Sequence, residues 1–258
     1  MNKWGLTIRA AGITLALLAV KVVVEYLNID TLSVSTLVTA FIGGAIFTIA
    51  IIFAGVLADY KESEKIPAEI ATALRTMYSD LALVRVADNG IVPRMRRNVC
   101  NLLITINTNF RNNTWDLQLV DRAIGCLAED ISRLVDGNVP PQYTVKLKNE
   151  LGTIDKLSHR IKTIEATSFI PAAYAISELA TAGVVLLLLL VRLEPLFEGI
   201  VIFSVISMLM ISLLLLIRDM DNPFETGKNS CADVDLFLLW DLEEALVKKE
   251  EECRPAFS

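Results

Sequence analysis

The chain has 258 residues, of which 53% are hydrophobic and 21% charged, and its formal net charge is −6. The hydrophobic residues are concentrated in long runs: residues 31–58 and 199–217 contain no Asp, Glu, Lys or Arg, and residues 166–191 contain only Glu178. This distribution excludes a soluble globular enzyme, a disordered chain and a disulfide-rich secreted domain. The acidic balance gives no indication of nucleic-acid binding.

Four segments are long and apolar enough to cross the hydrocarbon core of a bilayer, which takes about 20 helical residues. We predict spans over residues 10–27, 37–57, 167–191 and 195–217. The short connections between them make two hairpins on either side of a long polar insert. The predicted fold class is an all-α, polytopic membrane protein with four transmembrane helices. Its expected parts are a first hairpin (1–57), a helical insert (58–166), a second hairpin (167–217) and an acidic tail (218–258).

The distribution of Lys and Arg predicts the orientation of the chain, because cytoplasmic loops are enriched in these residues. The insert carries 15 of them, whereas the turn between the first two spans carries none and the turn between the last two carries only Arg192. We therefore expect a multi-pass protein of the cell inner (plasma) membrane, with both termini and the insert in the cytoplasm.

The insert reads as four helices, because its apolar residues recur at helical spacing and show no strand alternation. The first helix follows Pro67, the second follows Pro93, the third covers residues 115–135 and the fourth follows Pro141. Thr114 or Asn113 is available to cap the third helix, and Gly137 to end it. No breaker separates the fourth helix from the third span, which leaves one continuous long helix open.

The tail differs from the nearly neutral insert, since residues 219–258 contain 11 acidic and 4 basic residues. Apolar residues between positions 234 and 247, among them Leu236, Leu239 and Trp240, are numerous enough for this segment to dock on a partner surface.

No pattern typical of a catalytic or cofactor site occurs, so we predict neither an enzyme nor a bound cofactor or metal. The single histidine, His159, lies on the predicted fourth helix of the insert and is interpreted as a surface or packing residue. The four cysteines have no metal-binding spacing and would lie in the reducing cytosol, where no disulfide is expected. They are Cys100, Cys126, Cys231 and Cys253.

Charged residues inside the spans are informative, because each costs at least about 2.5–3.5 kcal/mol at the centre of a bilayer. Glu178 lies well inside the third span and is either an ion or proton site or a carboxyl group paired with a neighbouring helix. Lys21 and Glu25 are four residues apart on one helix face. They are interpreted as a structural pair, with a charged vestibule at the outer end of a pore as the alternative.

The second span contains many small residues among large apolar ones, which allows close approach of helices. Several of its large residues also fall on one helical stripe. If several copies surrounded an axis, this stripe could form a hydrophobic constriction that gates by dewetting, whereas the other interpretation is ordinary packing within a bundle. The candidate neck residues are Ile42, Ile46, Ile49, Ala50 and Phe53.

The junction after the fourth span, Asn222-Pro223-Phe224, resembles the bestrophin family of ion channels. The order of two spans, a helical insert and two more spans is also similar to that family, as is the run from Asp59 to Pro67 after the second span. The resemblance covers most of the chain as a layout and about 20 residues as a motif.

This resemblance implies a homopentameric ion channel in the bilayer, with a hydrophobic neck made by the second span of each copy and a vestibule made by the insert. Two family features are missing: the Arg-Trp-Trp run after the second span, and the acidic run of the animal calcium clasp, which Glu225-Thr226-Gly227-Lys228 replaces. Calcium gating is therefore not carried over. Animal members conduct anions such as chloride and a bacterial member favours cations, so the resemblance somewhat favours anions and leaves cations open.

Two other functions remain open at this point. A flagellar-stator-type motor subunit has the same order of spans, and in it Glu178 would sense protons beside a partner subunit. A non-conducting membrane scaffold would instead use the insert and the acidic tail to bind a cytosolic partner.

Overall fold

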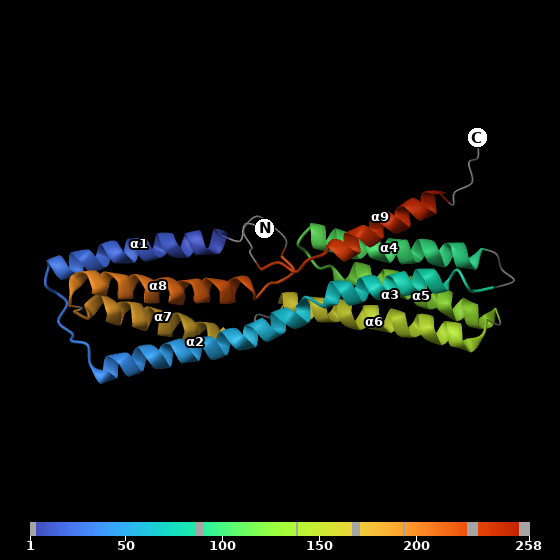
Figure 1. Ribbon diagram of the computed structural model, residues 1–258. Coiled ribbons are helices and arrows are strands. Elements are labelled where there is room, and N and C mark those ends of the chain that lie inside the picture. Colours follow the sequence, from blue (N-terminus) through green and yellow to red (C-terminus); the bar gives the residue numbers. More distant parts are fainter. Residues whose placement is uncertain are drawn as a thin grey trace. The chain divides into compact units, whose positions relative to one another are not determined.

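The structure is a computed structural model that describes residues 4–85, 90–137, 139–166, 171–192, 194–225 and 232–252. Within these residues nine α-helices form two compact units, each of which is described by itself (Figure 1). The unit that we call the membrane unit comprises Met1–Tyr60, Ser168–Pro223 and Gly227–Asp233. The unit that we call the polar unit comprises Lys61–Thr167, Phe224–Thr226 and Val234–Ser258.

The membrane unit is built from the four predicted spans, all of which are helices long and apolar enough to cross a membrane. Their bounds are α1 (Gly5–Tyr26), α2 (Thr36–Ser63), α7 (Pro171–Leu190) and α8 (Leu196–Asp219). The all-α prediction is confirmed for the described residues. The helix α2 continues to Ser63 because its polar end remains helical beyond the apolar segment.

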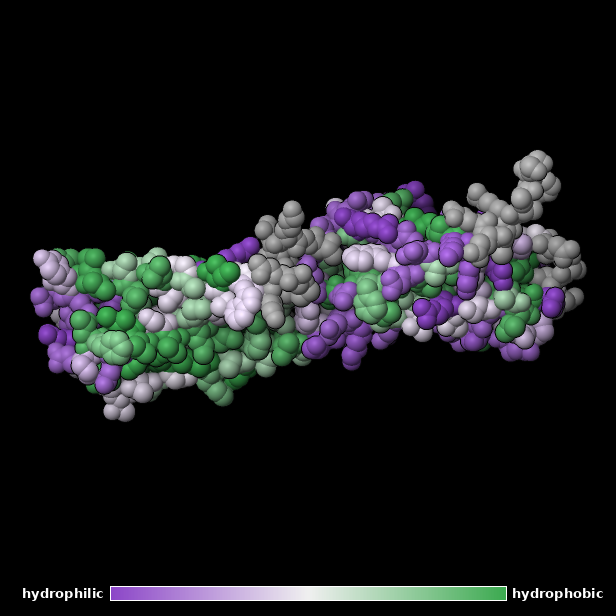
Figure 2. All heavy atoms as spheres, turned by 45° about the horizontal axis from the view of Figure 1, so that its top comes forward, coloured by the Kyte–Doolittle hydropathy of each residue, from purple (hydrophilic) through white to green (hydrophobic). Residues whose placement is uncertain are grey.

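Apolar side chains form both the interior and the surface of the membrane unit. Helices α1, α7 and α8 pack directly on one another. Helix α2 joins their core through Ala45, Ile49 and Val56, which contact a cluster that includes Val184 of α7 and Phe203 of α8. Figure 2 shows hydrophobic residues spread over the visible face of this unit, as a bundle surrounded by lipid or by other copies requires.

The two hairpin turns of the membrane unit are joined by backbone hydrogen bonds. The amide of Leu32 donates to the carbonyl oxygen of Leu190 at 3.2 Å, and the amide of Arg192 donates to that of Leu32 at 2.8 Å. These bonds satisfy polar groups of the chain where the helices end, and they fix the end of α7 against the turn that leads into α2.

The polar unit contains five helices in the described residues, and hydrophilic side chains predominate on the face that Figure 2 shows. Four of them match the predicted helices of the insert: α3 (Ile66–Asp80), α4 (Ile91–Arg111), α5 (Leu117–Asp136) and α6 (Pro141–Ala166). Their apolar faces enclose a core of fully buried side chains. It includes Ile70, Leu74, Met77, Leu102, Leu103, Ile106, Val120, Leu127, Leu147 and Ile154.

The start of α5 corrects one detail of the sequence analysis. The N-cap is Asp116, whose carboxylate accepts hydrogen bonds from the amides of Gln118 and Leu119, and it is neither Thr114 nor Asn113. The preceding Trp115 is buried against α6, where its indole N–H donates to the carbonyl oxygen of Ser158 at 3.1 Å. Docking of Trp115 therefore decides which polar residue can reach the first turn. Residues 167–170 lie outside the described residues, so the expectation of one helix through α6 and α7 stays untested.

The apolar segment of the tail docks on the polar unit itself. It forms α9 (Phe237–Glu252), which packs on α3 and α4. Leu239, Leu242 and Leu246 are buried in this contact. The buried amide of Asn107 on α4 donates to the Leu239 carbonyl oxygen at 3.1 Å and to the Glu243 carboxylate at 2.6 Å. Trp240, expected to contribute to docking, remains 41% exposed.

Candidate functional site

The second membrane helix presents two very different faces. Its inner face, centred on Ile49 with no exposed surface, contacts the core of the membrane unit. The opposite face, which we call the open α2 face, follows helical spacing and has no contact partner sufficient to bury it within the chain. It consists of Gly43, Phe47, Ala50, Ala54 and Leu57, all of them exposed. This face is apolar, contains three small residues and carries no charge.

The five candidate neck residues do not share one of these faces. Ala50 belongs to the open α2 face. Ile42, Ile46 and Phe53 are half-buried and flank it, since each also packs against the core of its own chain. Ile49 is fully buried. The sequence alone could not separate these positions, because α2 is apolar around its whole circumference.

The membrane-embedded Lys21 is completely buried in the membrane unit. Its ammonium group donates to the carbonyl oxygens of Leu189 at 3.3 Å and Val191 at 2.7 Å, and lies 3.1 Å from the carboxylate of Glu25. A cation is favourable at this position because the carbonyl groups at the end of α7 form the negative end of its helix dipole. This arrangement favours the structural interpretation of the Lys21–Glu25 pair over an exposed vestibule charge.

Glu178 on α7 is not isolated, because the guanidinium group of Arg218 reaches it from the last turn of α8. The two charged groups are 2.5 Å apart, and their side chains are 47% and 54% exposed in the single chain. The sequence analysis used Arg218 only as an indicator of orientation and missed its pairing with Glu178. The geometry is that of a neutralised carboxylate linking two helices.

The Asn-Pro-Phe junction ends the membrane unit and begins a short segment of the polar unit. Pro223 is buried, and Phe224 is 6% exposed. Phe224 packs on Phe110 of α4, with ring centroids 5.9 Å apart, and Phe110 in turn contacts Trp115 at 5.0 Å. The motif thus supplies an aromatic anchor for the polar unit. Asn222, the first residue of the motif, is half-buried.

Some expectations concern residues outside the described part of the chain. These include Cys231, Cys253 and positions 226–228 of the segment that stands where animal relatives have a calcium clasp. Among the described residues, Cys100 is a buried and Cys126 an exposed free thiol.

The arrangement of helices is similar to that of known membrane protein structures. A crystal structure of a mutant bacterial bestrophin homologue from Klebsiella pneumoniae superposes with a TM-score of 0.77 and 13% identity, covering 93% of this chain and 99% of that chain. The chain has the bestrophin fold. A second structure of a homologue from Klebsiella pneumoniae, phased with zinc, gives a TM-score of 0.74 and 12% identity, with 95% and 98% of the two chains covered. A third, described as a membrane protein, gives a TM-score of 0.75 at 10% identity, with 98% and 99% covered.

No protein-family description and no curated protein sequence matches this chain. The resemblance inferred from the order of spans and the Asn-Pro-Phe junction is confirmed as a bestrophin fold over nearly the whole chain. At identities of 10–13% the similarity establishes the fold, and function has to be argued from the residues of this chain.

Proposed function

We propose that this protein is an ion channel formed by several identical copies, five by analogy with the family it resembles, around a central pore lined by α2. The observation that carries the proposal is the open α2 face. In a single chain this face leaves Phe47 67% exposed and Leu57 36% exposed, on a helix whose other side is anchored in the core.

The composition of the open α2 face suits a narrow, water-excluding passage. Gly43, Ala50 and Ala54 allow neighbouring α2 helices to approach closely around an axis. Phe47 and Leu57 provide bulk at two levels. A ring of such side chains without charges is a hydrophobic constriction, which controls ion flow by wetting and dewetting.

The five candidate neck residues receive different roles in this proposal. Ala50 lines the pore, and Ile42, Ile46 and Phe53 flank the lining at the contacts between adjacent helices. Because Ile49 is fully buried in the core of its own chain, we assign it a packing role.

The proposed orientation follows the Lys and Arg distribution, with both termini and the polar unit in the cytoplasm and the Lys21 region at the outer end. The Glu178–Arg218 pair has no net charge, so it gives no preference for cations or anions. Anion conduction remains somewhat favoured by the resemblance alone, and permeant inorganic ions are the expected substrates.

Reconstitution of the purified protein in planar bilayers tests the proposal. Single-channel currents without any added partner are expected, together with a particle mass of five chains in detergent. Silent bilayers with an intact oligomer would favour the scaffold alternative. Activity that requires a second type of subunit would favour the stator-type alternative.

The same measurements give the ion preference. A salt gradient across the bilayer yields a reversal potential whose sign distinguishes anion from cation conduction. A preparation that remains monomeric would contradict the proposal, because the open α2 face would then have no other copy to meet.

A further inference from the structure

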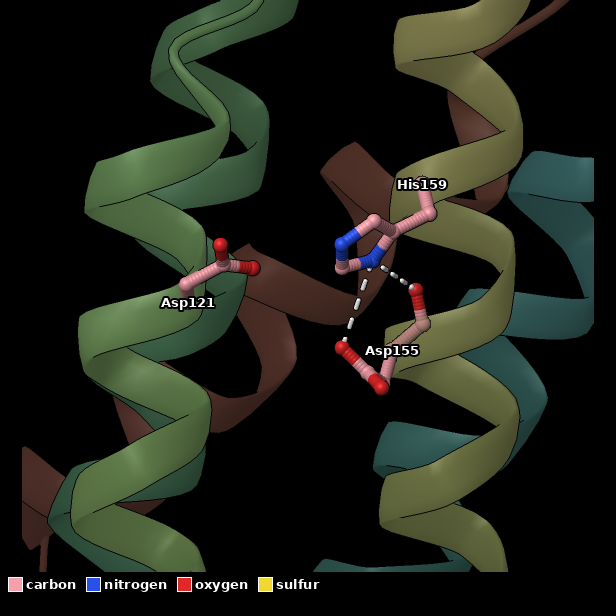
Figure 3. A group of neighbouring side chains, drawn as sticks. All are labelled: Asp121, Asp155 and His159. Carbon is pink, nitrogen blue, oxygen red and sulfur yellow. Dashed lines mark hydrogen bonds and ion pairs between the residues drawn. The ribbon is translucent and has the colours of Figure 1, made fainter.

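We propose that the polar unit holds a divalent transition-metal ion between α5 and α6, bound by Asp121, Asp155 and His159. This site is separate from the proposed pore and does not depend on channel activity. Each of the three residues offers one ligand atom, and these atoms all lie within 4.8 Å of one another (Figure 3).

The three side chains converge from two helices. Asp155 and His159 are four residues apart and therefore lie on one face of α6, and Figure 3 shows Asp121 approaching from the facing side of α5. A tetrahedral metal ion about 2.1 Å from each ligand needs ligand atoms roughly 3.4 Å apart. The His159 ring and the Asp155 carboxylate already have this separation, at 3.4 Å, so mainly the exposed Asp121 side chain has to move closer.

The hydrogen bonding of His159 prepares its ring for a metal. Nδ1 lies 3.0 Å from the backbone carbonyl oxygen of Asp155, which can only accept a hydrogen bond. Nδ1 therefore carries the proton, and the lone pair is on Nε2. Figure 3 shows Nε2 on the side of the ring that faces Asp121. A backbone carbonyl that fixes the tautomer in this way is the usual support for a metal-binding histidine.

The relative position of the two helices is fixed by contacts that the metal would not have to create. The indole N–H of Trp115 donates to the Ser158 carbonyl oxygen at 3.1 Å, next to His159. Lys162 donates to the backbone oxygen of Trp115 at 3.3 Å, and the Glu165 carboxylate accepts from its amide at 3.2 Å. Because Trp115 immediately precedes α5, these bonds hold Asp121 opposite the ligands of α6. The binding residues are thus largely preorganised.

One imidazole and two carboxylates define the class of metal. Imidazole nitrogen favours zinc, cobalt, nickel and iron over calcium and magnesium, which prefer oxygen ligands. Three protein ligands leave the remaining positions to water, as in open zinc sites. His159 also borders a cavity of about 590 Å³, whose walls include Glu62, Lys65 and Glu69, so solvent reaches the ring.

Titration of the full-length protein in detergent with Co²⁺ tests the inference, because Co²⁺ reports its ligands through visible absorption. We expect one Co²⁺ per chain with d–d bands and no sulfur-to-metal charge transfer. His159→Ala and Asp121→Asn should each weaken binding by about tenfold or more, since even loss of an outer-shell partner costs 10–100-fold. Excess Ca²⁺ should not displace Co²⁺, and Zn²⁺ should.

Two variants serve as matched controls. Asp136→Asn removes an exposed carboxylate at the other end of α5, and Cys126→Ser removes the exposed thiol of that helix; neither should change binding. Circular dichroism checks that each variant retains its helices. Absence of Co²⁺ binding, sulfur-to-metal charge transfer, displacement by Ca²⁺, or equal affinity in His159→Ala and Asp136→Asn would overturn the proposal.

Discussion

The ammonium nitrogen of Lys21 lies 2.7 Å from the carbonyl oxygen of Val191, which links the interior of α1 to the end of α7. Both partners are buried, with exposures of 0% and 1%. A lysine without a partner would be costly at this position, and so would helix-terminal carbonyls without donors. The contact with Glu25 at 3.1 Å completes a local set of neutralising partners. This arrangement makes Lys21 a residue that positions the second hairpin against the first.

The first prediction concerns this contact. Lys21→Met keeps most of the side-chain volume but removes the donor, leaving the Glu25 carboxylate without its cation. We expect the stability to fall by about 3–5 kcal/mol, the usual cost of breaking a buried ion pair. The measurement is the thermal unfolding midpoint of the purified protein in detergent.

The matched control for Lys21→Met is the double variant with Glu25→Gln. It removes the negative charge as well, so part of the lost stability should return. A single variant that is as stable as the parent would show that Lys21 has water within reach and is not buried in the assembled protein.

The second prediction concerns the pair of Glu178 and Arg218. Since the pair is half exposed, Glu178→Gln should lower the stability by only about 1 kcal/mol or less. The reversal potential of reconstituted channels should stay unchanged, because the pair as a whole is neutral. Adding Arg218→Gln should restore the unfolding midpoint. A shifted reversal potential with an unchanged midpoint would instead identify Glu178 as part of the ion pathway.

The third prediction separates the two faces of α2. Phe47→Ala, on the open α2 face, should raise single-channel conductance and change the unfolding midpoint little. Ile49→Ala should do the reverse, because it empties a fully buried position and costs about 2–5 kcal/mol. Single-channel recording and thermal unfolding of both variants provide the comparison. Altered conductance in Ile49→Ala alone would show that the inner face of α2 lines the pore.

The sequence predicted the four spans because about 20 consecutive apolar residues leave little choice of structure. The helix ends were less certain. We expected the second span to end at position 57, but α2 continues to Ser63, since helical hydrogen bonding does not stop where the apolar residues do. The cap of α5 was also missed, because Thr114, Asn113 and Asp116 are all good capping residues and a tertiary contact of Trp115 selects among them.

Partners that come together only in three dimensions were harder to predict. Lys21 bonds to backbone carbonyls, which leave no pattern in the sequence. Arg218 is 40 residues from Glu178, and their meeting depends on how α7 and α8 are aligned. Asp155 and His159 were visible as neighbours on one helix, whereas Asp121 comes from another helix. Local spacing therefore predicted elements and single candidates, and tertiary alignment decided which candidates form a site.

The last prediction concerns the approach of α2 to α7 at Gly183. A methyl group added at Gly183 would lie 3.2 Å from Cζ and 3.6 Å from Cε1 of Phe41, closer than the 3.5–4.0 Å of a relaxed carbon contact. Phe41 is 47% exposed, so its ring can turn aside. Gly183→Ala should therefore change the stability by less than about 1 kcal/mol, because the higher helix propensity of alanine offsets the ring movement.

A larger residue at position 183 cannot be accommodated in this way. We expect Gly183→Leu to push α2 away from α7, lower the unfolding midpoint and alter single-channel conductance through the displaced helix. The double variant Gly183→Leu with Phe41→Ala removes the ring that obstructs the leucine, so it should recover both properties in part. If Gly183→Leu alone matches the parent in stability and conductance, the close contact between α2 and α7 does not determine the position of α2 in the assembled protein.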